Sequence, residues 1–61
     1  MTDKDIVQQA YEDAIRKICE VYYDAMIVAP GLPEQALADQ RFQDGIRKAR
    51  AVRDRALGLV P

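Results

Sequence analysis

Hydrophobic residues recur along the first half of the chain in alternating steps of four and three. The repeat comprises Val7, Tyr11, Ala14, Ile18, Val21, Ala25 and Val28. Residues three and four apart lie on one face of an α-helix, so this spacing predicts a single long helix with one apolar side. Its outward side should carry the i,i+4 ion pairs Glu12–Arg16 and Asp13–Lys17.

The second half of the chain repeats the pattern after a short break. Its apolar positions are Ala38, Phe42, Gly45, Ala49, Val52, Ala56 and Leu59. In the break, Pro30 disfavours helical backbone in the residue before it, Gly31 is free to take a positive φ, and Pro33 suits the first position of a new helix. We therefore predict one domain over residues 1–61, with helices over about 3–29 and 33–57 and a turn at 30–32. Thr2 or Asp3 should cap the first helix, and Gly58 should mark the end of the second.

A connection this short joins antiparallel neighbours, so the sequence predicts an all-α helical hairpin. If the chain reverses near Gly31, residues whose numbers sum to 63 face each other. Large residues then meet small ones, as Ile18 meets Gly45, which is how facing layers interdigitate. The same rule places Val21 against Phe42 and Tyr11 against Val52.

A hairpin of 61 residues has little core of its own. Chains of this length bury only about 60% of their unfolded surface, and one cysteine without histidine supplies neither an internal disulfide nor the usual metal ligand. We therefore expect two copies to form an antiparallel four-helix bundle. A second apolar row beside the first is the expected dimer interface, with Cys19 as a buried structural thiol: Ile15, Cys19, Tyr22 and Met26.

Charge separates the two predicted helices. Residues 3–29 hold six acids and three bases, a net charge of −3, whereas residues 33–57 hold four acids and six bases, a net charge of +2. Attraction between the helices explains part of this asymmetry. Three arginines follow one another at three-residue spacing, however, and arginines kept close together suit bidentate contacts with carboxylate or phosphate. Either they form a solvated face, or they bind a partner together with the outward apolar residues of the first helix, giving the candidate set Arg47, Arg50, Arg53, Tyr23 and Ile27.

The residues needed for common enzyme chemistry are missing. The chain has no histidine, serine, asparagine or tryptophan, no glycine-rich phosphate loop and no metal-ligand spacing. We expect neither an enzyme nor a cofactor, metal or small-molecule substrate. No apolar stretch is long enough to span a membrane and the N-terminus is not a signal peptide, so we expect a soluble, cytoplasmic protein in a bacterial host.

Two functional classes remain, a protein-binding inhibitor and a nucleic-acid-binding regulator. The opening Met1-Thr2-Asp3-Lys4-Asp5-Ile6, the segment at residues 9–15, the proline turn and the arginine-bearing second helix resemble the small phage-encoded anti-activators of bacterial quorum sensing. This resemblance implies a dimeric hairpin that blocks a host transcription activator, at its DNA-binding domain. The alternative is a dimeric helical-hairpin regulator that binds RNA or DNA through the arginine face, as plasmid copy-number regulators of similar layout do. The near-balanced charge favours the protein partner.

Overall fold

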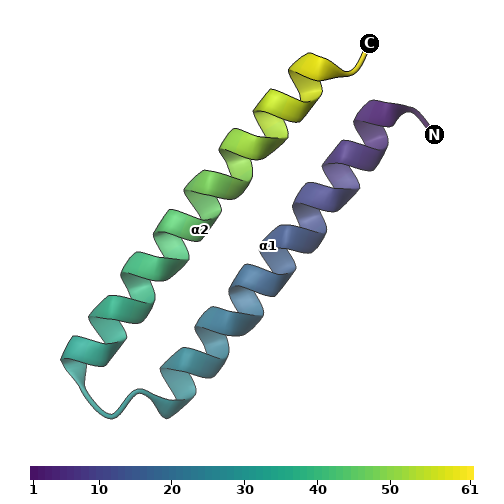
Figure 1. Ribbon diagram of the computed structural model, residues 1–61. Helices are drawn as coiled ribbons and strands as arrows, with labels where there is room; N and C mark the ends of the chain where they lie inside the picture. The colour runs from purple at the N-terminus through teal and green to yellow at the C-terminus, as the bar shows by residue number, and fades with distance from the viewer.

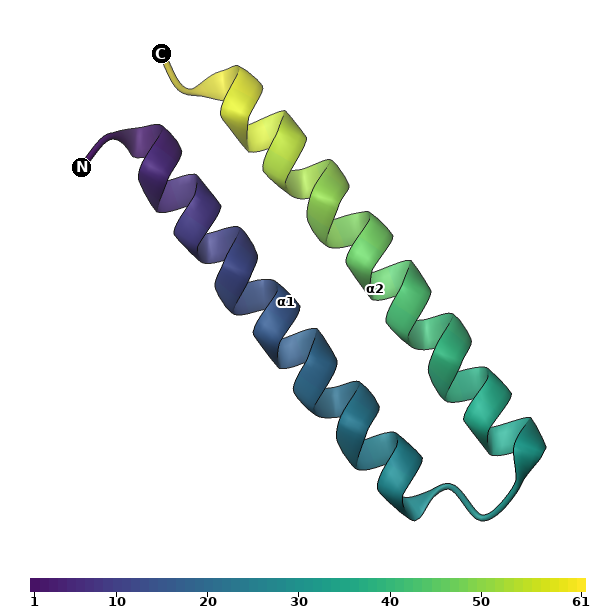
Figure 2. The same cartoon turned by 180° about the vertical axis from the view of Figure 1, so that it is seen from behind.

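The computed structural model describes all 61 residues as two antiparallel helices (Figure 1). Helix α1 spans Asp3–Val28 and helix α2 spans Leu32–Leu59. The helices lie side by side along their whole length, with both termini at the end away from the turn (Figures 1 and 2). The predicted all-α hairpin is confirmed, and each helix begins and ends within two residues of its expected bounds.

Local sequence fixes the beginning and end of α1. The Thr2 hydroxyl accepts a hydrogen bond from the Asp5 backbone N–H at 3.2 Å, and the Asp5 carboxylate accepts one from the Thr2 N–H at 3.0 Å. This capping box satisfies two backbone donors that the helix itself leaves free. At the other end Ala29 is extended, with φ −67° and ψ 119°, because Pro30 follows it.

The turn and the end of α2 differ from the prediction in detail. Gly31 has φ −164°, which is extended backbone, and no glycine in the chain has a positive φ. Helix α2 starts at Leu32, so Pro33 lies in its first turn but does not open it. Gly58 does not end α2, because the helix runs through it to Leu59 and the Val60 N–H bonds to the Ala56 carbonyl at 3.3 Å.

The seam between the helices follows a repeat of 3.6 residues instead of the predicted 3.5. A strict seven-residue stripe drifts by about 20° per heptad around a straight helix. Tyr22 takes the place expected for Val21, and Arg53 takes the place expected for Val52. Four residues assigned to the seam are therefore exposed, with 69%, 76%, 67% and 76% of their surface accessible: Val21, Val28, Val52 and Leu59.

Close packing in the seam centres on glycine and aromatic side chains. A Cβ at Gly45 would lie 3.3 Å from Ile18 Cγ2, which confirms the predicted contact of these two residues. The Tyr22 and Phe42 rings lie 4.7 Å apart between centroids, and the Arg53 guanidinium lies 4.4 Å from the centre of the Tyr11 ring. The sequence predicted Val21 against Phe42 and Val52 against Tyr11. In the structure Tyr22 and Arg53, each one residue further along the chain, make these contacts instead.

The hairpin has a seam but almost no core. Its Cα atoms span 47 × 17 × 6 Å, so the molecule is a single layer of two helices. Only Ala38 is buried, at 7% exposure, and ten large hydrophobic residues are exposed. Neither helix contains a stretch long and apolar enough to cross a bilayer. The hairpin has one layer of helices, whereas stable domains are usually built from at least two packed layers.

Candidate partner-binding surface

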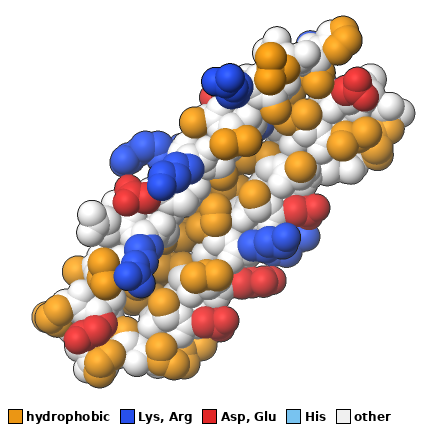
Figure 3. All heavy atoms as spheres, in the orientation of Figure 1, with side chains coloured by type: hydrophobic (Ala, Val, Ile, Leu, Met, Phe, Trp, Pro, Cys, Tyr) orange, Lys and Arg blue, Asp and Glu red, His pale blue; other side chains and the backbone are white.

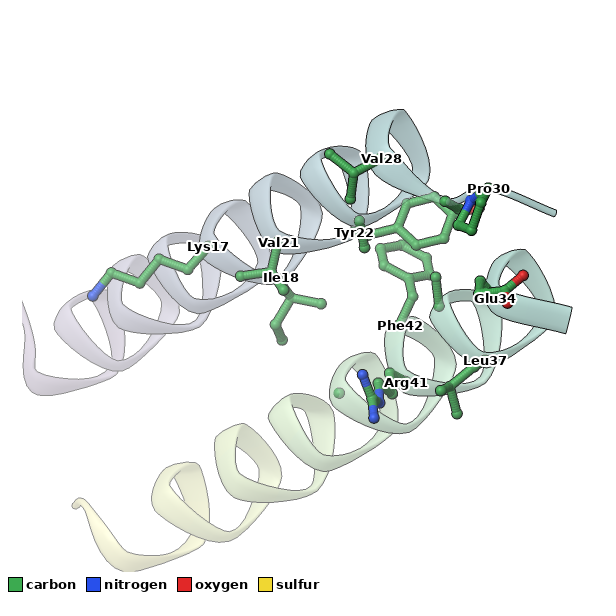
Figure 4. A pocket seen from close by; sticks show the side chains of 14 residues that line it. Lys17, Ile18, Val21, Tyr22, Val28, Pro30, Glu34, Leu37, Arg41 and Phe42 are labelled. Carbon is green, nitrogen blue, oxygen red and sulfur yellow. The ribbon is translucent and has the colours of Figure 1, made fainter.

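A groove of about 520 Å³ opens between the helices near the turn (Figure 4). Helix α1 contributes Ile18, Val21 and Val28 to its lining, and α2 contributes Leu37 and Phe42. Two charged side chains, Lys17 and Arg41, lie at its edges, and Glu34 lies at its turn end. The groove is thus an apolar depression with charged margins, and we call the side of the hairpin on which it opens the front face.

The front face extends beyond the groove toward the chain termini. Val52 and Leu59 follow Arg41 by eleven and eighteen residues, which is about three and five helical turns, so they lie on the same side of α2 as Arg41. Both are exposed, like Val21 and Val28 in the groove. An apolar strip therefore runs along much of the front face.

The two rims of the front face carry opposite charge. Arg41, Lys48 and Arg55 repeat at seven-residue spacing along α2 and form its rim. The α1 rim is mixed but mainly acidic, because three acids flank or follow Lys17 on that side of the helix: Asp13, Glu20 and Asp24. Figure 3 shows blue side chains at intervals along α2 beside an orange band between the helices. The seven-residue spacing of the α2 rim was visible in the sequence, and it is the signal that could have located this face.

No ion pair joins the two helices. The three ion pairs in the hairpin are Arg16–Asp13 at 3.2 Å, Arg47–Asp44 at 3.6 Å and Arg53–Asp54 at 3.1 Å, each within one helix. The expected i,i+4 pairs of Arg16 and Lys17 do not form, because Arg16 turns to Asp13 three residues before it. The charge asymmetry is therefore not expressed as ion pairs across the seam, and the α2 rim cations Arg41, Lys48 and Arg55 have no ion pair in the hairpin.

The three candidate arginines do not form one surface. Arg47 and Arg50 are exposed on α2, where they border a hollow of about 300 Å³ with Gln43 and Ile46. Arg53 instead turns into the seam over Tyr11, and its side chain is only 27% exposed. The expectation of a continuous arginine face is wrong for Arg53, because the 3.6-residue seam includes that position.

Tyr23 and Ile27 lie on the far edge of the hairpin from Arg47. Both are 68% exposed on α1. Ile27 follows the seam residue Ile18 by nine residues, about two and a half turns, so it points away from α2. Arg47 follows the buried Ala38 by the same nine residues, so it points away from α1. A single hairpin therefore does not bring the apolar and cationic candidates together.

In the row expected to form the dimer interface, Ile15, Cys19 and Met26 lie away from the groove, whereas Tyr22 is one of the residues that line it. In the single hairpin Ile15 and Met26 are half-buried and Cys19 is exposed, and the burial of Cys19 in a dimer stays a prediction. Tyr22 is used within the hairpin, because its ring packs on Phe42 and its hydroxyl donates a 2.7 Å hydrogen bond to Asp39. That hydrogen bond, together with partial desolvation and the Asp39 charge, raises the pKa of Tyr22 above its ordinary value.

Comparison of the chain with protein-family models, with curated proteins and with solved structures found no match. The surfaces themselves are therefore the basis for a functional proposal. No group of three or more acidic or cysteine side chains converges in a way that could hold a metal ion. What the hairpin offers is an apolar groove with charged rims and a pair of exposed arginines.

Proposed function

We propose that this protein is a non-enzymatic binding protein that dimerises into a four-helix bundle and inhibits a host protein by covering part of its surface. The observation that carries the proposal is the burial of a single residue in 61, beside ten exposed large hydrophobic side chains. Single exposed hydrophobic residues are ordinary in monomeric proteins, but an apolar strip along one face, as Val21, Val28, Val52 and Leu59 form here, is typical of interaction sites. A hairpin of this kind functions by contact with other chains.

Arg47 and Arg50 are the residues we assign to the host partner, together with Tyr23 and Ile27. A guanidinium binds carboxylates in a bidentate geometry, and exposed aromatic and arginine side chains contribute strongly to protein interfaces. Arg53 is left out of this set because it packs on Tyr11. The resemblance to anti-activators supplies the specific form of the proposal: the target is a bacterial transcription activator, bound at its DNA-binding domain so that DNA is occluded.

The test is capture from a bacterial lysate with tagged protein, with and without nuclease, followed by repetition with the purified partner. We expect the parent chain to retain one protein in stoichiometric amount after nuclease treatment and Arg50→Glu to lose it. Lys4→Glu makes the same change of charge at a distant exposed site and should bind normally. Helicity and oligomeric state should be the same in all three proteins.

Two results would overturn the proposal. If Arg50→Glu unfolds or changes the oligomeric state, the arginine serves the fold and the assigned surface is wrong. If the retained protein disappears after nuclease and RNA or DNA is recovered instead, the chain is a nucleic-acid-binding regulator whose arginines contact phosphate.

A further inference from the structure

We propose that two copies dimerise front face to front face with their turns at the same end, so that α1 of each copy lies on α2 of the other. This inference rests on the dimer of the proposed function and names its interface and its symmetry. It places the interface at the groove and its apolar strip instead of the row containing Cys19, because the front-face residues Val21, Val28, Val52 and Leu59 are the more exposed.

The size of the front face fits a stable interface. Its Cα extents of 47 Å and 17 Å give a projected area of about 800 Å², which is large enough for an interface of the usual size, about 800 Å² of accessible surface per partner. The strip at its centre is apolar and its rims are charged, which is the usual anatomy of an interface core and periphery. A second copy supplies a strip of the same length.

Charge decides how the second copy is oriented. A two-fold axis along the bundle lays the mainly acidic α1 rim of each copy beside the basic α2 rim of the other. A two-fold axis across the bundle would instead lay α2 on α2, which opposes Arg41, Lys48 and Arg55 to themselves. In the first arrangement Arg41, which has no ion pair in the hairpin, lies level with Asp24 of the other copy, whereas the second arrangement brings the cations of the two α2 rims together.

The register along the axis agrees with this choice. Facing residues of α1 and α2 have numbers that sum to 63 or 64, as the Ile18–Gly45 and Tyr22–Phe42 contacts show. In the parallel dimer this rule also relates the two copies, so Asp24 lies within about 3 Å, along the axis, of Arg41 of the second copy. The groove of one copy then meets the groove of the other, and the widest apolar surfaces cover each other.

The parallel dimer also brings the host-binding candidates onto one edge. The outer side of α1, which carries Tyr23 and Ile27, stacks on the outer side of α2 of the second copy, which carries Arg47. Tyr23 and that Arg47 are about seven residues apart in level, or roughly 10 Å along the axis. In one hairpin Tyr23 and Ile27 lie on one edge and Arg47 lies on the other. The second copy brings its Arg47 to the edge that carries Tyr23 and Ile27.

Charge reversal tests the interface. By sedimentation equilibrium, Arg41→Glu and Asp24→Arg should each raise the dimer dissociation constant by about tenfold or more, and the two changes in one chain should restore most of the loss. Lys4→Glu is the control, because it makes the same change of charge at an exposed position that belongs to neither rim and has no ion pair, and it should leave the dissociation constant unchanged. A dimer insensitive to Arg41→Glu, or double-variant chains no tighter than the single variants, would overturn the proposed interface.

A distance measurement tests the orientation independently. Leu32→Cys in a Cys19→Ser background places one spin label at an exposed turn position outside the front face. Pulsed electron paramagnetic resonance should give a separation below about 30 Å, since neighbouring helices pack 8–10 Å apart and the turns share one end. A separation near the 47 Å length of the hairpin would overturn the parallel arrangement and leave the dimer of the proposed function intact. A chain that stays monomeric in sedimentation would overturn both.

Discussion

Substitution of Gly45 tests how closely the two helices approach. A Cβ at this position would lie 3.3 Å from Ile18 Cγ2 and 3.5 Å from Ile18 Cδ1, slightly inside ordinary van der Waals contact. Alanine in place of glycine gains about 1 kcal/mol of helix stability. Ile18 also lines the groove, which leaves it room to move by a few tenths of an ångström. We therefore expect Gly45→Ala to raise the free energy of unfolding by about 0.5 kcal/mol, since the displaced contact offsets part of the gain.

A larger side chain should reverse the sign. Gly45→Leu adds three further carbons where Ile18 already stands in contact, and overpacking of this kind costs about 1–3 kcal/mol. After the helix-propensity gain, we expect a net loss of about 1–2 kcal/mol. Urea unfolding followed by far-ultraviolet circular dichroism measures both, at one protein concentration because association shifts apparent stability.

Ala51→Gly is the matched control for this pair. Ala51 is exposed in the same helix, so the change reports propensity alone and should cost about 1 kcal/mol. A loss of more than about 1 kcal/mol in Gly45→Ala would show that Ile18 has no freedom to yield. An increase in stability for Gly45→Leu would mean that the helices do not meet closely at this level.

Three further substitutions address contacts outside this level. Tyr22→Phe removes the hydroxyl whose pKa is raised in the folded state. Its contribution to stability is fully present below the unfolded-state pKa of about 10 and is lost as pH rises through the folded-state pKa. In urea titrations, the variant should therefore lose less stability at alkaline pH than the parent chain. Thr2→Ala should cost about 1 kcal/mol and speed amide exchange in the first turn of α1, and unchanged exchange would contradict the capping box. Arg53→Gln keeps most of the stem but loses the cation over Tyr11, and thermal unfolding should show a deficit of about 0.5–1 kcal/mol.

The helices, their limits and their antiparallel pairing follow from local signals in the sequence. Thr2 and Asp5 specify the start of α1, and Pro30 specifies its end within one residue. Gly45 could be matched to Ile18 in advance because glycine destabilises a helix interior, a cost that is offset where a large side chain packs against the bare backbone. The extended backbone of Gly31 was not predictable, since a residue free to adopt several conformations is fixed by the length of the turn around it.

The side-chain environment of the predicted stripe was only partly predictable. Ion pairs depend on which rotamer each long side chain adopts, so Arg16 pairs with Asp13, three residues before it, although Glu12, four residues before it, was also within reach. Arg53 was assigned to an exposed face because its charge suggested one, but its stem and guanidinium fill the seam against Tyr11. The spacing of hydrophobic residues in the sequence does not distinguish a position in the seam between the helices from the neighbouring position on the same helix.

The difference between stripe and seam is itself informative about the assembly. A seam between two straight helices needs apolar residues at an average spacing of 3.6 positions. This chain also has apolar residues that repeat at an average spacing of 3.5 positions. Val21, Val28, Val52 and Leu59 are surplus to the hairpin, and all four drift toward the same side, where the groove opens. A solvated single layer would have no reason to be apolar there. The proposed dimer accounts for these residues by adding a second layer on the front face, and the unpaired cations Arg41, Lys48 and Arg55 beside them favour the parallel orientation that we propose for it.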